Sequence, residues 1–514
     1  MPSENNKRIA KNTLFLYFRM LLTMGVSLYT SRIVLATLGV GDFGIYGVVG
    51  GVISIFSFLN SSMSGATSRF LTFALGKGDR DEAQRTFSAA LTIHILIALF
   101  ILILAETVGL WFLENKLVIP PERMSVARFV YQLSIISTII NITQVPYNAT
   151  IIAHERMNVY AYVEILNTCL KLGIVYLLVI GHWDKLLLYA VLTLVVSIFI
   201  RVIYRSYCNK QFEESKYKFE WNKKLIYPML SFSGWDLYGN LSVIARTQGV
   251  NMLLNIFFGT LFNAANSVAV QVQSAVLSFA SNIITAVRPQ IIKNYATQNY
   301  QYMIKLALTT SKYIYLLLLI LALPLILEMN FVLNIWLKNV PPYAVSFCRW
   351  TLIFIFFSTQ SNILVSTINA TGNNKRPSLI NGTLYLSVIP VSYLAFKWGA
   401  TPEIPYICNI LFVFIGMMSN AYTLKLHISQ FSIKDFVFKV LCICFFITVI
   451  SFGVSFYVKQ SMQESFWRFA MVVCTSTVST SLLTYFVAMD KNTKNKIRGK
   501  VSNFIIANKM IWKS

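Results

Sequence analysis

Residues 86–113, TFSAALTIHILIALFILILAETVGLWFL, decide the fold of this chain. The stretch contains one acidic residue, Glu106, and no Lys or Arg. It is long enough to cross about 30 Å of hydrocarbon, which takes about twenty apolar residues in a helix. A helix is expected because the apolar residues run continuously and do not alternate with period two, as they would in a transmembrane strand. Lipid is therefore the solvent of this segment.

The rest of the chain has the same character. Of its 514 residues, 56% are hydrophobic and 12% are charged, and the mean hydropathy is +0.61, whereas a soluble domain carries about 25% charged residues. About fourteen membrane spans are expected from runs of sufficient length. The spans lie at 12–38, 43–68, 86–113, 124–152, 157–181, 185–207, 225–257, 261–287, 303–327, 343–370, 377–397, 404–426, 436–458 and 465–489. The predicted fold class is an all-α polytopic membrane protein without a soluble domain.

The distribution of positive charge predicts the orientation. The net charge of +24 could indicate a nucleic-acid partner, so the location of the charge matters more than its size. With a cytoplasmic N-terminus, about thirty of the 44 Lys and Arg residues lie in inner segments and about nine in outer loops. This positive-inside asymmetry predicts a multi-pass protein of the plasma membrane with both termini in the cytoplasm, and argues against nucleic-acid binding.

The two ends of the chain agree with this orientation. Lys7, Arg8 and Lys11 precede an apolar run that is too long for the core of a signal peptide. The tail, residues 490–514, is basic and contains scattered apolar residues. We expect it to lie on the anionic inner leaflet.

Similar patterns recur about 217–220 residues apart, as expected for two repeats of six spans each. Leu38-Gly39 corresponds to Phe258-Gly259, Arg69 to Arg288, and Ala153 to Ala370. An even number of spans preserves orientation, so the repeats are predicted to be parallel, with the substrate path between them. The predicted domains are an N-terminal six-helix bundle at 1–208, a cytoplasmic linker at 209–224, a C-terminal six-helix bundle at 225–428, two additional helices at 429–489 and the tail at 490–514.

Several motifs resemble catalytic or cofactor sites but lack the required context. Gly39 to Gly44 matches G-x-G-x-x-G, but no strand precedes it and no ribose-binding acid follows, so a turn is expected. Asp79 to Glu82 contains Asp-x-Asp, but its loop is too short for a nucleotide-binding domain. The seven cysteines have no metal-ligand spacing, and no Walker A motif is present. We therefore predict a protein that is not an enzyme and has no cofactor or metal.

Polar residues inside the predicted spans point to a substrate cavity. A charge at the centre of a membrane helix costs about 2.5–3.5 kcal/mol, so such residues usually line a cavity or find partners. At 100° per residue, Arg19 shares a face with Thr23 and Thr30. The other polar faces comprise Glu164, Asn167 and Lys171; Asp236 and Asn240 with Arg246 at the edge; Asn141, Gln144 and Asn148; and Asn266 and Gln273.

Two interpretations of these faces are open. Glu164 with Lys171, or Asp236 with Arg246, could be pairs that only hold helices together. The surplus of uncharged amides favours a cavity for a cargo with an anionic group and many hydroxyls, because arginine binds phosphate bidentately and amides bind sugars. A lipid-linked oligosaccharide has both features. Each unpaired hydroxyl taken into hydrocarbon costs about 4–8 kcal/mol, so such a glycan needs a hydrophilic path.

The chain resembles the multidrug/oligosaccharidyl-lipid/polysaccharide (MOP) flippase superfamily, and specifically its bacterial polysaccharide branch, the Wzx-type O-antigen flippases. The resemblance rests on the span count, the six-span repeat, the stretch from Lys11-Asn12-Thr13 to Ile45-Tyr46, and Arg288-Pro289-Gln290. It implies two bundles that alternate access around a cationic cavity in the bacterial inner membrane. It also implies an undecaprenyl-diphosphate-linked glycan as cargo, membrane lipids as surroundings, and a polysaccharide polymerase and chain-length regulator as partners.

The hypothesis that follows assigns roles to the polar faces. Arg19, Lys171 and Arg246 hold the diphosphate, and Asp236 or Glu164 binds a coupling proton or sodium ion. The glycan is held by the amides Asn240, Asn141, Gln144, Asn148, Asn266 and Gln273. The alternatives are a lipid II flippase, a MATE-type ion-coupled drug antiporter, which would need buried acids without basic neighbours, and a membrane glycosyltransferase or polymerase, which would need a large outer loop.

Overall fold

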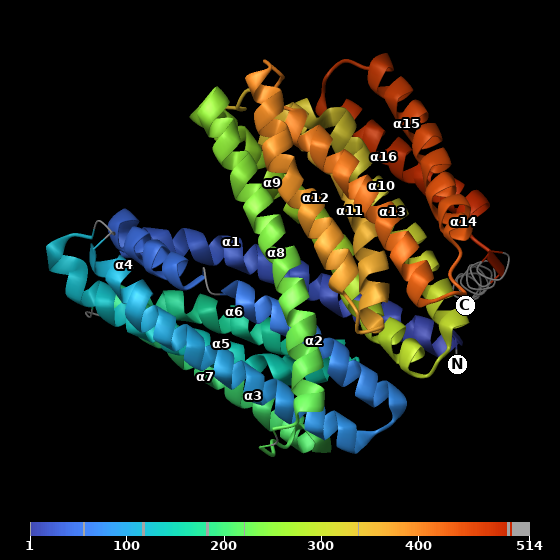
Figure 1. The fold of residues 1–514 in the computed structure, drawn as a ribbon. Coiled ribbons are helices and arrows are strands. Elements are labelled where there is room, and N and C mark those ends of the chain that lie inside the picture. Colours follow the sequence, from blue (N-terminus) through green and yellow to red (C-terminus); the bar gives the residue numbers. More distant parts are fainter. Residues whose placement is uncertain are drawn as a thin grey trace, which may run out of the picture. The chain divides into compact units, whose positions relative to one another are not determined.

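The computed structural model describes residues 2–54, 57–115, 119–180, 184–219, 221–337, 339–490 and 494–495. These residues are almost entirely helical and contain no strand (Figure 1), so the predicted fold class is confirmed. The elements are α1 (Pro2–Ser54), α2 (Ser57–Lys77), α3 (Arg80–Leu104), the π-helix η1 (Ala105–Gly109), α4 (Leu110–Asn115), α5 (Pro121–Ala153), α6 (Met157–Ile180), α7 (Lys185–Gln211), the 3-10 helix η2 (Glu213–Ser215), α8 (Lys223–Phe258), α9 (Thr260–Ala296), α10 (Tyr300–Trp336), α11 (Ala344–Ala370), α12 (Lys375–Lys397), α13 (Ile404–His427), α14 (Ile433–Phe436), the π-helix η3 (Val437–Cys442), α15 (Ile443–Ser461), α16 (Phe466–Leu483) and the π-helix η4 (Thr484–Ala488).

The helices follow the predicted spans closely from the third span onward. The stretch 86–113 is covered by α3, η1 and α4 together, and the last predicted span, 465–489, by α16 and η4. Eleven segments of the described chain are long and apolar enough to cross a membrane. The long helices outside that set are α1, α2 and α8, and α8 carries Asp236 and Arg246.

The turn expected at residues 39–44 is present at a single glycine. Two helices meet within α1 at Gly39, whose φ of 78° and ψ of 168° are not helical. A positive φ is readily adopted only by glycine, because other residues carry a Cβ that clashes there. No strand precedes this glycine in the described chain, as the turn interpretation of the G-x-G-x-x-G pattern requires.

A second irregularity bends α10. Pro324 lies inside the helix, and Glu328 has non-helical angles of φ −105° and ψ 25°. Two cations bind carbonyls at this bend: Arg349 Nε donates to the Ile326 oxygen at 3.0 Å, and Lys459 Nζ donates to the Leu327 oxygen at 2.6 Å. Side-chain donors thus satisfy carbonyls that a regular helix would pair internally.

The chain forms two compact units. Unit 1 comprises Met1–Ala245, Asn282–Met303 and Val365–Thr383. In it α5 lies against α2, α3 and α7, and α1 lies against α6. Part of its core is aromatic: Phe87 of α3 and Tyr147 of α5 meet edge to face at 5.2 Å, and Tyr204 of α7 is fully buried.

Unit 2 comprises Arg246–Ser281, Ile304–Leu364 and Leu384–Ser514. Its last two long helices, α15 and α16, lie side by side (Figure 1), and the buried hydroxyls of Thr480 and Ser451 hydrogen-bond across them at 3.2 Å. Lys312 of α10 donates to the Ala488 carbonyl at 2.5 Å, which ties this pair to α10. The predicted domain boundaries remain a prediction, and of the expected tail only residues 490 and 494–495 lie among the described residues.

Candidate substrate site

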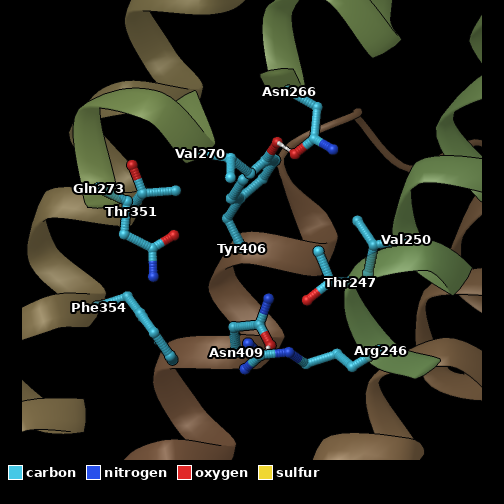
Figure 2. Close-up of a pocket in the computed structure, with 10 residues that line it drawn as sticks. All are labelled: Arg246, Thr247, Val250, Asn266, Val270, Gln273, Thr351, Phe354, Tyr406 and Asn409. Atoms are coloured by element: carbon cyan, nitrogen blue, oxygen red, sulfur yellow. Dashed lines mark hydrogen bonds between the residues drawn. The ribbon is translucent and has the colours of Figure 1, made fainter. Parts of the chain in front are cut away.

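Unit 2 contains a polar pocket between α8, α9, α11 and α13 (Figure 2). Its volume is about 50 Å³, which is room for a few water molecules, since one needs about 10–15 Å³. Most of its lining side chains are polar. They are Arg246, Thr247, Asn266, Gln273, Thr351, Tyr406 and Asn409, with Val250, Val270 and Phe354 as the apolar part. We call this the Arg246 pocket.

Arg246 is held in a fixed orientation. Its guanidinium carbon lies 4.6 Å from the ring centroid of Tyr385 on α12 and 5.3 Å from that of Phe354 on α11. Its Nη1 donates to Asn409 Oδ1 on α13 at 3.2 Å (Figure 2). That bond uses one of the five N–H donors of the group. The two rings and the amide therefore fix the plane of a cation that is suited to bidentate binding of an anion.

The amide of Asn266 is equally well fixed. Its side chain is buried, accepts a hydrogen bond from the Tyr406 hydroxyl at 2.7 Å (Figure 2) and donates to Asn251 Oδ1 at 3.2 Å. Asn263 also donates to Asn251 Oδ1, at 2.7 Å. This chain of bonds orients hydrogen-bonding groups of α8, α9 and α13 before any ligand arrives, which reduces the ordering cost of binding.

Unit 1 contains Arg19, the predicted phosphate-binding cation of span one. Arg19 Nη2 donates to Asn282 Oδ1 on α9 at 3.4 Å, and the guanidinium lies 4.9 Å from the centroid of Tyr160 on α6. On the same helix, Glu164 accepts a hydrogen bond from the Tyr204 hydroxyl at 3.1 Å. Lys171, also on α6, is exposed. In the structure the described partner of Glu164 is thus a tyrosine.

The remaining predicted residues of unit 1 lie on α8 and α5. Asp236 Oδ2 accepts a hydrogen bond from Asn240 at 3.1 Å and interacts electrostatically with Arg288 of α9. On α5, Asn141 is exposed, whereas Gln144 is buried. Gln144 Oε1 and Asn148 Oδ1 are buried and have no hydrogen-bond partner within the described part of the chain. Buried oxygens of this kind are normally satisfied by water or a ligand.

Of the predicted site residues, Arg246, Asn266 and Gln273 line one pocket, and the other predicted residues belong to unit 1. The ligand roles of all of them, and the ion-coupling roles of Asp236 and Glu164, remain predictions. Sequence reasoning missed Asn409, Tyr385 and Tyr406. An amide inside an apolar span is a signal that could have found Asn409, but the aromatic residues are indistinguishable from ordinary lipid-facing or core residues.

The described residues contain no cluster of three or more His, Cys, Asp or Glu side chains that could hold a metal ion. Outside the spans, Asp184 precedes α7 and pairs with Arg123. Burial acts to raise the pKa of Asp184, but the hydrogen bond from Arg123 and the backbone donors of Leu187 and Leu186 lower it below its ordinary value. Arg123 also pairs with Asp42 of α1.

Comparison with known proteins identifies the fold. No family model and no curated protein matches the sequence. Among solved structures, a MATE in the straight conformation has a TM-score of 0.71 and 14% identity, covering 83% of this chain and 97% of its own. An outward-facing multidrug resistance MATE family transporter of the MOP superfamily has a TM-score of 0.66 and 14% identity, covering 82% and 97%.

A third similar structure is a MOP superfamily transporter from Pyrococcus furiosus, described as having a binding pocket of reverse polarity that suggests a different function. Its TM-score is 0.67 and its identity 13%, with coverage of 82% of this chain and 96% of its own. The chain therefore has the fold of these MATE transporters. At these identities the likeness concerns the fold alone.

Proposed function

We propose that this protein is a flippase that moves an undecaprenyl-diphosphate-linked glycan from the cytoplasmic to the outer leaflet by alternating access, for surface polysaccharide (O-antigen or capsule) biosynthesis. The observation that carries the proposal is the Arg246 pocket: a guanidinium fixed by two rings and an amide, among hydroxyl and amide side chains. A diphosphate sugar presents an anion and hydroxyls together, which is the chemistry that this set of groups binds.

The pocket is proposed to bind one group of the cargo. At about 50 Å³ it is far smaller than a glycan. A phosphate or one edge of a sugar can replace the few waters it would hold and make the same hydrogen bonds, so that little is lost on displacement. The rest of the cargo would lie outside it.

Residues of unit 1 supply the second part of the proposal. Arg19, fixed by Asn282 and Tyr160, and the exposed Lys171 are proposed to contact the remaining phosphate charge. Asp236 or Glu164 is proposed to take up a coupling proton or sodium ion. The buried oxygens of Gln144 and Asn148, which have no partner in the described chain, are proposed to accept hydrogen bonds from sugar hydroxyls or from the water around them.

The energetics favour export of such a cargo. Moving one elementary charge through a membrane potential of 100 mV is worth about 2.3 kcal/mol, so a dianionic headgroup that moves outward across an inside-negative membrane gains about 4.6 kcal/mol. The proposed setting is the inner membrane of a bacterium, with both termini cytoplasmic. A polysaccharide polymerase and a chain-length regulator would use the delivered glycan.

Surface-glycan display tests the proposal. In cells whose display depends on this protein, Arg246→Ala should abolish display while immunoblots show a normal amount of protein in the membrane. Arg246→Lys should restore only part, because an ammonium does not form the bidentate bond. The matched control is Lys439→Ala, which removes an exposed cation of unit 2. Normal display in Arg246→Ala would refute the assignment of the pocket.

A MATE-type drug antiporter is the second candidate, because the similar structures are MATE transporters. The charged residue of the pocket argues against it, since Arg246 would repel a cationic drug. Expression of the protein in a drug-sensitive strain separates the two functions. Resistance to cationic dyes that is lost in Asp236→Asn would favour the antiporter.

Rescue of a strain depleted of its lipid II flippase would favour lipid II as the cargo.

A further inference from the structure

A fully buried carboxylate lies in the turn between α5 and α6, at an end of unit 1 that is predicted to face the cytoplasm. Glu155 has a side chain with no exposed surface, and three side chains bind it. Arg8 Nε of α1 and Lys293 Nζ of α9 each lie 2.7 Å from a carboxylate oxygen, and Gln290 Nε2 of α9 donates at 2.6 Å. One anion thus connects the start of the chain, the α5–α6 turn and the end of α9.

The backbone at this position indicates that the carboxylate is there for its contacts. Glu155 has a φ of 60°, a conformation that favours glycine. The corresponding turn of the second repeat, after α11, has a glycine at the position 217 residues later, Gly372, with a φ of 83°. The fold therefore requires a left-handed residue in both turns, and the first turn retains a glutamate in spite of the steric cost.

The second turn is held by a cation from the first repeat. Arg69 of α2 is buried, lies 4.5 and 4.7 Å from the ring centroids of Phe70 and Phe73, and donates to the Ala370 carbonyl at 3.0 Å. A Cβ at Gly372 would lie 2.7 Å from Arg69 Nη2. Arg69 corresponds in the repeat to Arg288, on the helix that also carries Gln290 and Lys293. Each repeat therefore contributes a helix end that holds the turn of the other repeat.

The two helix ends also meet directly. A Cβ on Gly76 of α2 would lie 2.9 Å from Ala296 Cβ and 3.0 Å from Lys293 Cα of α9. Contacts this short leave no room for a side chain, so α2 and α9 cross at their backbones. Phe73 and Tyr295 add a ring contact at 6.3 Å beside the crossing.

We infer that these contacts form a pair of latches that keep the predicted cytoplasmic end of unit 1 closed and must separate before cargo can enter from that side. The Glu155 latch consists of Arg8, Glu155, Gln290 and Lys293, and the Arg69 latch of Arg69, Ala370 and Gly372. Elements of both repeats meet here, and alternating access requires the repeats to move against each other. The inference rests on the alternating-access part of the proposed function and is independent of the cargo.

Cysteine labelling tests the Glu155 latch without any cargo. Ala286, on α9 one turn before Gln290, is fully buried against Leu16 and Met157. An Ala286→Cys reporter is treated with a membrane-impermeant maleimide in inside-out vesicles, and mass spectrometry reads the labelling rate at residue 286 alone, so the native cysteines can stay. Glu155→Gln should raise that rate about tenfold, the change expected for a loss of about 1.4 kcal/mol of closed-state preference.

Four further variants make the result interpretable. Glu213→Gln, which removes a largely exposed carboxylate paired with Arg80 on the same predicted side, should leave the rate unchanged. Glu155→Asn should raise it as Glu155→Gln does, and asparagine tolerates the positive φ of the turn, which guards against misfolding. Gly76→Ala should raise it without altering any charge, whereas Gly173→Ala, at a site with no neighbour within 4 Å, should not.

The outcomes separate the latch from the cargo. A labelling rate in Glu155→Asn equal to that of the parent, in protein that elutes as a single species, overturns the latch. If glycan display is lost in Arg246→Ala while the labelling rate of Glu155→Asn stays at the parent value, the proposed function stands and only the latch is refuted.

Discussion

Replacing Gly372 by alanine should destabilise the protein more than the same change at Gly78. Both glycines follow a helix and have similar positive φ, 83° and 77°, so each substitution incurs a backbone cost of about 1–2 kcal/mol. A Cβ at residue 78 would meet nothing within 4 Å, whereas one at residue 372 would lie 2.7–3.1 Å from the Arg69 guanidinium. Arg69 is buried and would have to leave the Ala370 carbonyl, which adds a further loss of about 1.5–3 kcal/mol.

The expected loss is therefore about 2.5–5 kcal/mol for Gly372→Ala and about 1–2 kcal/mol for Gly78→Ala. Chemical denaturation in detergent, followed by circular dichroism, measures both changes, provided that the slope of unfolding free energy against denaturant concentration is the same in all variants. Arg69→Met provides the internal check, because it keeps an unbranched side chain without the guanidinium. In that background Gly372→Ala should cost no more than Gly78→Ala. Equal losses for the two alanine variants in the parent protein would show that the Arg69 contact contributes nothing.

Two further predictions concern ion pairs. Glu328→Gln should lower the free energy of unfolding, measured by thermal melts, by about 3–5 kcal/mol, because it leaves the nearly buried Arg468, 2.6 Å away, without its main partner. Asp435→Asn breaks the exposed pair with Lys439 and should change the free energy of unfolding by less than about 1 kcal/mol in the same measurement. The pKa of Asp184 is lowered in the folded state. The stability that its ionised form contributes is therefore fully present above the pKa of an unfolded aspartate, about 4, and is lost as the pH falls from there through the lower pKa of the folded protein. Asp184→Asn, which can still cap α7, should flatten the dependence of melting temperature on pH between about 3 and 5, and an unchanged slope would contradict the role of Arg123.

The sequence predicts the helices well because each is specified locally. An apolar run of span length can satisfy its backbone in lipid only as a helix, so 86–113 appears as α3, η1 and α4 with a difference of a few residues at each end. The turn at Gly39 is local as well, since glycine readily adopts a positive φ. α10 also contains Pro324, a residue type that favours a bend, four residues before the non-helical Glu328.

The partners of the polar residues could not be predicted in the same way. Arg19 shares a face with Thr23 and Thr30 by periodicity, but its partner Asn282 lies 263 residues away. Arg246 lies 163 residues from Asn409. Periodicity gives the direction of a side chain on its own helix and says nothing about which helix faces it.

Arg69 illustrates the limit of the charge rule. Its position at the inner end of a span makes it count toward the positive-inside asymmetry, which treats it as a solvated loop cation. In the structure it is buried, stacks on two phenylalanine rings and binds a carbonyl 301 residues away. The charge rule depends on the side of the membrane alone, so a structural cation and a solvated one give the same signal.

The strength of the latch has to match the free energies that drive transport. Arg8 is about half exposed, so its pair with Glu155 contributes little, about 0–1 kcal/mol. The bonds from Lys293 and Gln290 to the buried carboxylate contribute about 1–3 kcal/mol. A total of about 1–4 kcal/mol keeps the end closed by a factor of roughly 5 to 700, at about 1.4 kcal/mol for each factor of ten. The proposed dianionic cargo gains about 4.6 kcal/mol per 100 mV on leaving. A latch of this size is strong enough to close the predicted cytoplasmic end at rest, and the free energy of one transport cycle is large enough to open it. If the partner at the position of Arg8 were fully buried, breaking its ion pair with Glu155 would cost about 3–5 kcal/mol more, and the latch would be too strong for the transport cycle to open.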